Sequence, residues 1–358
     1  MALFKNLFNK SSKKNPRGFE FVKISSIDRI SPDTVKVSFD APKDGSFDFI
    51  PGQYVNVAIQ INGKEERRSY SICSGETEPL SIGVKEVLNG TVSKWFNLDA
   101  NVGTEILISK PEGNFTKPVD ARNCVAIAAG SGITPIVSIA KQLEANGSLR
   151  LYYGNKREED ILFRETLDGL KNTSPVYFLS QEDKESFEKG RITKEALVDE
   201  IKKDLSILKS DVFFLCGPEE MIKSSREALE MFGITSDKIK FELFTTPTEE
   251  MKPKGAASAD NSNFSGASEV TIIIDGDEET FTVPNNKTIL DGALAKGIDA
   301  PYSCRGGVCS SCKGKIVKGS ANMRINYSLT DSEIEEGYIL TCQAEPREEK
   351  ITIDYDQV

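Results

Sequence analysis

The chain has 358 residues, of which 38% are hydrophobic and 28% are charged, and its formal net charge is −10. That length predicts two or three domains with separate hydrophobic cores, and the acidic balance argues against nucleic acid as a partner. The sequence contains no histidine, which excludes a Rieske centre, a His-ligated metal site and a Ser-His-Asp triad.

The first 18 residues form a basic segment. Residues 1–17 carry five basic side chains and no acidic one, and four apolar residues recur at helical spacing. This pattern fits an amphipathic helix that contacts a membrane surface, but for so short a segment a frayed terminus is the favoured interpretation. The segment lacks the apolar core and cleavage site of a secretory signal. No apolar run in the chain approaches the roughly 18 residues of a membrane-spanning helix.

Residues 19–115 have the pattern of an antiparallel β-barrel. Residues 34–39 and 54–59 alternate or are rich in β-branched side chains, and Gly and Pro punctuate the region. The motif R-x-Y-S places Arg68 and Tyr70 on one face of a strand. An arginine fork suits a pyrophosphate, and a tyrosine ring suits stacking on a planar heterocycle.

A short helix is expected after Gly90, running through Trp95 and Leu98. Ser93 then lies at the helix start, where backbone N–H groups and the helix dipole attract phosphate. An N-cap role for Ser93 is compatible with phosphate binding.

Residues 116–245 alternate strands and helices, as a doubly wound α/β domain does. Near the start of this region a buried strand runs into a glycine turn and then a helix. Gly130 and Gly132 would let the backbone approach a dinucleotide pyrophosphate, and Thr134 would supply a hydroxyl group. The turn does not match G-x-G-x-x-G, so the common Rossmann fingerprint is not satisfied.

Two further strand ends carry candidate ligand-binding residues, one at 154–157 and one at 216–221. Lys156 and Arg157 follow a strand end where an acidic residue would instead bind an unphosphorylated ribose, which favours NADPH over NADH. The alternative is that these two cations are solvated charges beside the acidic residues 158–160.

Residues 246–268 contain only two bulky apolar side chains, Met251 and Phe264, and are typical of a flexible linker. From residue 269 onward a compact unit is expected, with 16 acidic and 9 basic side chains and a net charge of −7. This charge provides solubility, or it forms an acidic face for a basic partner or for the flavin-binding part of the chain.

Four cysteines in the last region suggest a metal centre. Cys304, Cys309 and Cys312 have the spacing C-x4-C-x2-C, and Cys342 follows after 29 further residues. This is the plant-type spacing of a [2Fe-2S] cluster held by four thiolates. A structural zinc site is the alternative, although zinc sites usually pair two C-x2-C units and this group has one.

The three other cysteines are Cys73, Cys124 and Cys216. Their odd number argues against a disulfide framework and for a reducing compartment. We therefore expect a cytoplasmic protein.

The motifs occur in an order that resembles the ferredoxin–NADP reductase superfamily with a C-terminal plant-type ferredoxin. The set comprises R-x-Y-S, G-x-x-S, Gly-Ser-Gly-Ile-Thr-Pro, Cys-Gly-Pro-x-x-Met and the four spaced cysteines. The chain is most similar to the subfamily of reductases that serve phenylacetyl-CoA epoxidases, and it is similar also to reductases of ketosteroid hydroxylases. The resemblance implies an antiparallel β-barrel for FAD, a doubly wound α/β nicotinamide domain and a β-grasp ferredoxin domain.

The resemblance also implies roles at matching positions in the barrel. Arg68 would hold the FAD pyrophosphate, Tyr70 would flank the isoalloxazine and Ser71 would hydrogen-bond near its reactive N5. Gly90 and Ser93 would contact the FAD phosphates, which favours FAD over FMN.

Further roles are implied in the α/β domain. The positions that would bind the dinucleotide or lie beside its nicotinamide are Gly130, Gly132, Thr134, Cys216, Gly217 and Pro218. Glu242 and Phe244 match the end of the nicotinamide domain in flavohaemoglobins, where a Glu and an aromatic side chain approach the flavin. The candidate catalytic residues are therefore Tyr70, Ser71, Cys216, Glu242 and Phe244.

The function implied is an NAD(P)H-dependent reductase that passes electrons through FAD and a [2Fe-2S] cluster to a partner oxygenase. Nicotinamide gives two electrons at once, whereas the cluster takes one at a time, and flavin can connect the two. The expected acceptor is a phenylacetyl-CoA epoxidase, with a ring or steroid hydroxylase or a membrane desaturase as alternatives. An alternative of another class is a non-catalytic redox or nucleotide sensor with zinc at the four cysteines.

Overall fold

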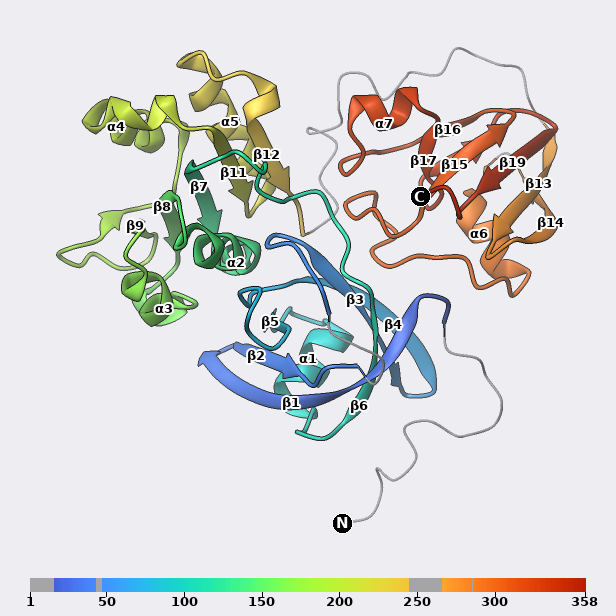
Figure 1. Ribbon diagram of the computed structural model, residues 1–358, viewed down its shortest axis with the longest axis horizontal. Helices are drawn as coiled ribbons and strands as arrows, with labels where there is room; N and C mark the ends of the chain where they lie inside the picture. Colours follow the sequence, from blue (N-terminus) through green and yellow to red (C-terminus); the bar gives the residue numbers. More distant parts are fainter. Residues whose placement is uncertain (1–15, 43–46, 245–265, 285) are drawn as a thin grey trace. The chain divides into compact units, whose positions relative to one another are not determined.

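The computed structural model describes residues 16–42, 47–244, 266–284 and 286–358 (Figure 1). The expected N-terminal helix and most of the expected linker lie outside these residues. The described chain forms two compact units: unit 1 is Phe19–Phe244, and unit 2 is residues 266–358 together with residues 16–18. Among the described residues, no helix is long and apolar enough to cross a membrane.

The first half of unit 1 is a six-stranded sheet with the order β4-β3-β6-β1-β2-β5. All neighbouring strands are antiparallel. The strands are β1 (Phe19–Ser31), β2 (Thr34–Phe39), β3 (Tyr54–Ile61), β4 (Lys64–Ser71), β5 (Ser81–Lys85) and β6 (Glu105–Ser109). A bridge between Ile72 and Ile82 joins the end of β4 to β5, so the two edges of the sheet meet and the expected barrel is confirmed.

One helix, α1 (Thr91–Leu98), packs on this barrel. Its buried side chains include Val92 and Phe96, which join the core formed by the valines and isoleucines of the strands. Strand β3 buries six consecutive residues, Tyr54–Ile59, and β6 buries four, so these strands are covered on both faces, whereas β1 is largely exposed on one face.

The second half of unit 1 is a parallel sheet with the order β10-β9-β8-β7-β11-β12. Its strands are β7 (Asn123–Ala129), β8 (Ser148–Asn155), β9 (Thr173–Leu179), β10 (Glu188–Lys189), β11 (Val212–Cys216) and β12 (Ile239–Glu242). Its helices are α2 (Ile133–Leu143), α3 (Arg164–Gly169), α4 (Lys194–Lys203) and α5 (Glu219–Met231). Helices α2 and α3 cover one face and α4 and α5 the other (Figure 1), which confirms the doubly wound architecture.

The strand order of this sheet reverses between β7 and β11. The chain runs outward from β7 through β8 and β9 and then returns to the other side of β7 at β11. In open α/β sheets, ligands bind at the carboxyl ends of the strands beside such a reversal. We therefore expect a ligand site, here called the crevice, at the carboxyl ends of β7 and β11.

The sequence predicts a helix near residues 160–170, and the helix in the structure is shorter. A 3-10 turn at Glu158–Asp160 comes first, and α3 begins only at Arg164. Phe163 has a φ of 56°, and this left-handed backbone cannot continue a right-handed helix. The sequence pattern missed this break because the apolar spacing continues through it.

Unit 2 has a mixed five-stranded sheet with the order β14-β13-β19-β15-β17 and a two-stranded sheet of β16 and β18. Its strands are β13 (Ala267–Ile274), β14 (Asp277–Pro284), β15 (Lys313–Lys318), β16 (Ala321–Met323), β17 (Tyr338–Leu340), β18 (Ala344–Pro346) and β19 (Lys350–Asp354). Its helices are α6 (Ile289–Ala295) and α7 (Asp331–Glu335). Strands β13 and β19 are parallel and the other pairs in the larger sheet are antiparallel.

Two details define the limits of unit 2. Strand β13 begins at Ala267, inside the stretch expected to be linker, because Ala267 and Ser268 already pair with β14. Residues 16–18 belong to the unit because Arg17 donates hydrogen bonds to the Ile274 carbonyl (2.8 Å) and to the Asp299 carboxylate (2.9 Å).

Core packing in unit 1 gives a stability prediction. Leu151 in β8 has no exposed surface, whereas Leu205 in the same half is 58% exposed. Truncating a buried leucine leaves a cavity and loses apolar burial, so Leu151→Ala should lower the free energy of unfolding by about 2–5 kcal/mol. Urea unfolding of the full chain, followed by flavin release, measures this change.

Leu205→Ala is the matched control and should change the free energy of unfolding by at most about 0.5 kcal/mol. Equal effects of the two substitutions would contradict the burial assigned to β8.

Candidate functional site

The glycine turn after β7 lies directly against the end of β11. A Cβ atom on Gly132 would be 2.1 Å from the carbonyl oxygen of Cys216, so this position has no room for a side chain. Gly130 has a φ of 54°, and its carbonyl oxygen accepts a hydrogen bond from the Tyr153 hydroxyl (2.9 Å). The two turns identified from the sequence therefore meet at the strand reversal of the sheet.

Residues from three strands converge beside this crevice. Cys216 and Glu242 are direct partners in the register of β11 and β12. The Ser71 hydroxyl, at the end of β4 in the barrel, donates a hydrogen bond to Glu242 Oε2 (3.3 Å). Three of the five candidate catalytic residues thus come together although they lie up to 171 positions apart in the sequence.

Cys216 is fully buried at this junction. Burial raises the pKa of its thiol well above the ordinary value, and the nearby Glu242 carboxylate raises it further. Cys216 is therefore a neutral thiol in the ordinary pH range, and it offers a small, polarisable surface rather than a nucleophile.

Arg68 and Tyr70 lie on the other face of β4 from Ser71, because side chains alternate along a strand. The Tyr70 ring stands edge-on to Phe96 of α1, with 5.8 Å between centroids. The Arg68 side chain is 48% exposed, and its guanidinium lies 3.1 Å from the Glu66 carboxylate. The R-x-Y-S motif and α1 therefore share one region of the barrel, as a common ligand would need.

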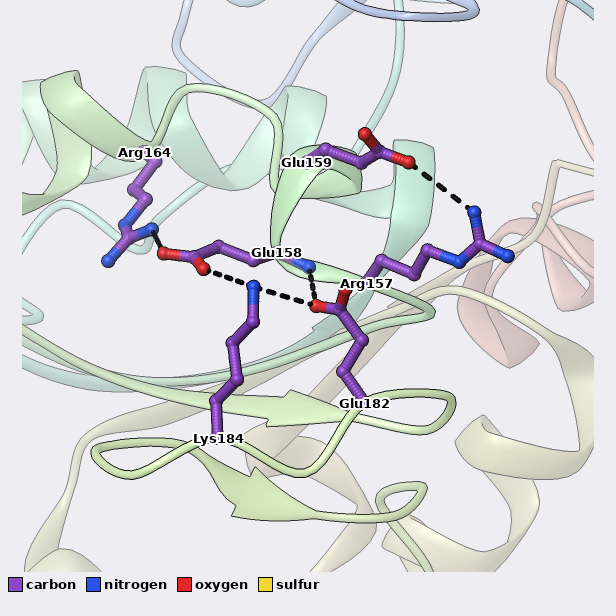
Figure 2. A pocket seen from close by; sticks show the side chains of 6 residues that line it. All are labelled: Arg157, Glu158, Glu159, Arg164, Glu182 and Lys184. Atoms are coloured by element: carbon purple, nitrogen blue, oxygen red, sulfur yellow. Dashed lines mark hydrogen bonds and ion pairs between the residues drawn. The ribbon is translucent and has the colours of Figure 1, made fainter.

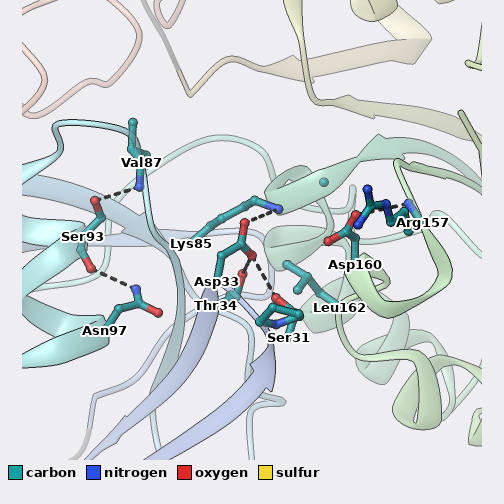
Figure 3. A network of polar contacts seen from close by, with 12 residues as sticks. Ser31, Asp33, Thr34, Lys85, Val87, Ser93, Asn97, Arg157, Asp160 and Leu162 are labelled. Atoms are coloured by element: carbon teal, nitrogen blue, oxygen red, sulfur yellow. Dashed lines mark hydrogen bonds and ion pairs between the residues drawn. The ribbon is translucent and has the colours of Figure 1, made fainter. Parts of the chain in front are cut away.

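The start of α1 differs from the expectation for Ser93. The N-cap residue is Gly90, and the helix begins at Thr91, so Ser93 is not the cap. Ser93 is buried, and its hydroxyl accepts a hydrogen bond from the Val87 backbone N–H (3.1 Å; Figure 3). A Cβ on Gly90 would lie 2.5 Å from this hydroxyl. Ser93 thus shapes the loop before α1, and no side chain caps the first-turn N–H groups.

The Thr134 hydroxyl, which was expected to contact the dinucleotide, makes a hydrogen bond within the protein. Thr134 is 2% exposed, and its hydroxyl donates a hydrogen bond to the Ser131 carbonyl within the glycine turn (3.0 Å). Its methyl group packs against β5, where a Cβ on Gly83 would be only 2.6 Å away. Thr134 therefore holds the turn against the barrel, and its predicted contact with the dinucleotide stays a prediction.

The remaining predicted positions lie around the crevice. Pro218 is the N-cap of α5, and a Cβ on Gly217 would be 3.1 Å from the Ala129 backbone nitrogen. Phe244, at the end of unit 1, is 41% exposed. The ring is accessible to a ligand, and its predicted approach to the flavin stays a prediction.

Several hydrogen bonds and an ion pair connect the barrel and the α/β half of unit 1. The sequence did not predict these contacts. Ser138 of α2 donates a hydrogen bond to the Ser74 carbonyl (2.6 Å), and one turn later Lys141 pairs with Glu78 (2.6 Å). The Lys240 ammonium donates to two backbone carbonyls, those of Asn114 and Thr116, in the segment that connects the halves. Lys240 lies two residues before Glu242, so the same strand is fixed at both points.

A charged pocket lies at the carboxyl end of β8, beyond the crevice (Figure 2). It is lined by Arg157, Glu158, Glu159, Arg164, Glu182 and Lys184. Lys184 pairs with Glu158 (2.7 Å), Arg164 also pairs with Glu158, and these two partners hold the pKa of Glu158 below its ordinary value. Arg157 makes only a long pair with Glu159 (3.5 Å), and its side chain is 55% exposed.

The four cysteines of unit 2 gather in two pairs. The Cys309 thiol donates to the Cys304 sulfur over 3.0 Å, and the Cys312 thiol donates likewise to Cys342. The bond from Cys309, with help from the Gly306 N–H, lowers the pKa of Cys304 to about 6. The same bonds raise the pKa of the donor thiols, Cys309 and Cys312, well above the ordinary value, so each pair holds one thiol of lowered pKa and one of raised pKa.

This donor set fits a two-iron cluster. Two sulfur pairs can hold two irons, with two thiolates for each. Among the described residues, no three Cys, His, Asp or Glu side chains surround a single point that would hold one metal ion. The loop gains its curvature from Gly307 (φ 74°) and Arg305 (φ 54°), whereas Gly306 between them has no positive φ.

Comparisons with known proteins agree with this arrangement. The model of an oxidoreductase FAD-binding domain matches residues 21–116, and that of an oxidoreductase NAD-binding domain matches residues 126–227. The model of a 2Fe-2S iron-sulfur cluster binding domain matches residues 272–347. These matches confirm the predicted cofactors FAD, NAD(P)H and [2Fe-2S], and they argue against the zinc sensor.

Two curated relatives cover most of the chain. One component of the 1,2-phenylacetyl-CoA epoxidase from Escherichia coli (strain K12) is 32% identical over 354 residues, or 94% of this chain and 98% of that protein. The ferredoxin reductase component of 3-ketosteroid-9-alpha-monooxygenase from Mycobacterium tuberculosis (strain CDC 1551 / Oshkosh) is 30% identical over 314 residues, which is 86% of each chain.

Solved structures share the three-domain fold. Phthalate dioxygenase reductase, described as a modular structure for electron transfer from pyridine nucleotides to [2Fe-2S], superposes with a TM-score of 0.59 at 25% identity. The match covers 94% of this chain and 98% of that one. An intact type IV self-sufficient cytochrome P450 monooxygenase gives a TM-score of 0.71 at 20% identity, over 94% of this chain and 41% of that one, and shows the fold alone.

The contact between Gly132 and Cys216 gives a prediction about the crevice. Gly132→Ala would force the two turns apart by more than 1 Å, because the clash is with backbone atoms. Misplacement of this size near reacting groups costs about a hundredfold in rate. We expect kcat/KM for NAD(P)H to fall by that factor in ferricyanide reduction, with bound FAD retained.

Gly169→Ala in α3 is the control, since a Cβ there would meet nothing within 4 Å. A Gly132→Ala enzyme with kcat/KM within threefold of the parent would show that the crevice is not the nicotinamide site.

Proposed function

We propose, because this chain belongs to the ferredoxin–NADP reductase superfamily and carries a C-terminal [2Fe-2S] ferredoxin domain, that it is the reductase component of a multicomponent oxygenase. The finer proposal is that its acceptor is the oxygenase of a phenylacetyl-CoA epoxidase. The observation that carries this assignment is the 32% identity over 94% of the chain to an epoxidase component, which extends through all three cofactor domains.

The chemistry is supplied by bound cofactors: FAD takes a hydride from NAD(P)H, and the cluster carries its electrons onward one at a time. The residues of the chain bind, orient and shield these groups. Glu242 holds the Ser71 hydroxyl at the junction of the two halves, and the neutral Cys216 lies beside it. We assign Ser71 to the flavin side of the hydride path and Cys216 to the nicotinamide side.

The binding surfaces are assigned in the same way. Arg68 and the uncapped start of α1 supply positive charge for the FAD pyrophosphate, and Tyr70 supplies a flanking ring. Gly130 and Gly132 supply a close backbone approach for the dinucleotide. Phe244 covers the flavin until nicotinamide takes its place.

A steroid or ring hydroxylase is the second candidate acceptor. The 30% identity to a ketosteroid monooxygenase reductase over 86% of the chain supports it, and the smaller coverage places it behind the epoxidase. The alternative of a membrane desaturase rested on the basic residues 1–17, of which only Pro16 and Arg17 are described.

Reconstitution tests the acceptor. The purified chain is mixed with the oxygenase component of a phenylacetyl-CoA epoxidase, NADPH and phenylacetyl-CoA, and epoxide formation is measured. The parent chain should support turnover, and Cys309→Ser should abolish it because a pair of cluster ligands is broken. Cys309→Ser should also lose cytochrome c reduction but keep reduction of ferricyanide, which the flavin can serve directly.

Cys124→Ser is the matched control, because Cys124 is a buried thiol of β7 that lies outside the cluster group. It should behave as the parent chain does. Turnover with a ketosteroid hydroxylase but none with the epoxidase would move the assignment to the second candidate. Full cytochrome c reduction by Cys309→Ser would remove the cluster from the electron path.

We propose further that NADPH is preferred over NADH. Arg157 is largely exposed and its ion pair with Glu159 is long, so it can exchange that carboxylate for a 2′-phosphate at little cost. Arg164 and Lys184 are already committed to Glu158, and the pocket as a whole balances three cations with three carboxylates. Arg157 is therefore the cation on which the preference depends.

Arg157→Ala should lower kcat/KM for NADPH about tenfold and leave NADH unchanged, since a charge-assisted hydrogen bond to the phosphate is lost. Arg150→Ala is the control: Arg150 lies near the start of β8, the strand that ends two residues before Arg157, and it pairs with Asp204 (3.2 Å). An unchanged ratio of the two kcat/KM values in Arg157→Ala would show that Arg157 does not select the nucleotide.

A further inference from the structure

A chain of hydrogen bonds runs from a buried tyrosine to the cluster cysteines of unit 2. The Tyr355 hydroxyl donates to Thr341 Oγ1 (2.8 Å), and the Thr341 hydroxyl donates to the carbonyl oxygen of Cys312 (3.0 Å). The Thr341 backbone N–H donates to the same carbonyl oxygen (3.1 Å). Tyr355 directly follows β19, so the last strand of the fold is connected to the third cysteine of the motif.

The whole chain of contacts is shielded from water. Thr341 has no exposed surface, Cys312 is 1% exposed and Tyr355 is 8% exposed. Hydrogen bonds in such a low-dielectric interior are strong, and successive donors polarise one another. Burial also raises the pKa of the Tyr355 hydroxyl, so the group stays protonated and remains a donor.

The structure leaves space for the tyrosine. A Cβ on Gly314 would lie 3.4 Å from two Tyr355 ring atoms, so the ring packs over bare backbone two residues beyond Cys312. Tyr355 therefore belongs to the packing around the cysteine loop as well as to the core of unit 2.

The contacts link two cysteines that are far apart in sequence. Thr341 immediately precedes Cys342, and both its N–H and its hydroxyl bind the carbonyl oxygen of Cys312. These two bonds set the distance between the third and fourth cysteines, which form one of the two sulfur pairs. Tyr355 orients the Thr341 hydroxyl by donating to it.

The direction of the donors has an electrostatic consequence. Both O–H groups point from Tyr355 towards Cys312, so the positive ends of their dipoles face the cysteine pair. Reduction of a cluster held by that pair adds negative charge, and oriented dipoles of this sign stabilise it. Hydrogen bonds around the sulfurs are among the features that set the potential of such clusters.

We propose that Tyr355 is a positioning residue for the [2Fe-2S] cluster, which acts through Thr341 to fix the Cys312–Cys342 pair and to raise the cluster's reduction potential. The proposal rests on the cluster being bound by the four cysteines, as the proposed function requires, and it needs no particular acceptor protein. A raised potential favours electron flow from the flavin to the cluster.

The test is a redox titration of the full-length holoprotein, with the reduced cluster followed by electron paramagnetic resonance. Tyr355→Phe removes one hydroxyl and keeps the ring. We expect its midpoint potential to become more negative, by about a tenfold change in the one-electron equilibrium constant, or about 59 mV. The flavin potentials should not change.

Tyr338→Phe is the matched control in the same unit. Tyr338 lies at the start of β17, and its hydroxyl donates to the Gln357 carbonyl (2.9 Å), away from the cysteines. Removal of this hydroxyl should change the one-electron equilibrium constant for reduction of the cluster by less than threefold. Equal shifts in the two variants would overturn the proposal.

Substitutions at Thr341 separate positioning from a general loss of stability. Thr341→Ser keeps the hydroxyl and should retain the parent potential, whereas Thr341→Val keeps the volume and should shift it as Tyr355→Phe does. If Tyr355→Phe fails to retain a cluster, the difference in cluster potential between Thr341→Ser and Thr341→Val still tests the proposal.

Two results would overturn the assignment. One is a lowered Tm in Tyr355→Phe with an unchanged potential, which would mean that the tyrosine serves the core alone. The other is equal potentials in Thr341→Ser and Thr341→Val. No oxygenase is present in these titrations. Failure of the epoxidase reconstitution would therefore not change their result or its interpretation.

Discussion

The hydrogen bond between Ser71 and Glu242 is the contact on which the reductase unit depends. It joins the last residue of a barrel strand to the last residue of β12, and the strand register places Glu242 directly beside Cys216. A hydride can cross between two bound cofactors only where the surfaces that bind them meet, because transfer needs near-contact of the reacting atoms. The other contacts between the halves, at Lys240, Ser138 and Lys141, keep that meeting point in place. Burial keeps the Cys216 thiol neutral, and hydride transfer between bound cofactors needs no general base, which agrees with a chain that contains no histidine.

In unit 2, the cysteine site is likewise fixed by contacts between distant segments. The match to a 2Fe-2S iron-sulfur cluster binding domain, together with the C-x4-C-x2-C spacing, distinguishes a two-iron cluster from a zinc site. The pair formed by Cys312 and Cys342 is drawn together by Thr341 and supported from the core by Tyr355. Both units thus place a reactive centre at a junction of strands and fix it with contacts from residues outside the motifs, such as Ser138 and Lys240 in unit 1 and Tyr355 in unit 2.

Much of this could be predicted from the sequence, and the limits have a physical cause. The cysteine spacing, the glycine turn at Gly130–Gly132 and the alternation of strands and helices are local patterns, so they predicted the cluster, the crevice and the three folds. The N-cap alternative for Ser93 is wrong because Gly90 supplies the N-cap, while its contact with the FAD phosphates stays a prediction. Lys240 and Tyr355 were missed because a lysine in a strand or a tyrosine near a terminus carries no local signal. Their partners are set only when distant segments pack together.

The central claim is that one chain carries a two-electron flavin and a one-electron cluster in sequence. Anaerobic titration of the purified protein with NADPH, followed by absorbance and by electron paramagnetic resonance, tests this most directly. The flavin should take two electrons and the cluster one, so full reduction should consume three electrons per chain and develop the signal of a reduced [2Fe-2S] centre. Consumption of two electrons per chain, with bleaching of the flavin and no paramagnetic cluster signal in iron-replete protein, would contradict the account.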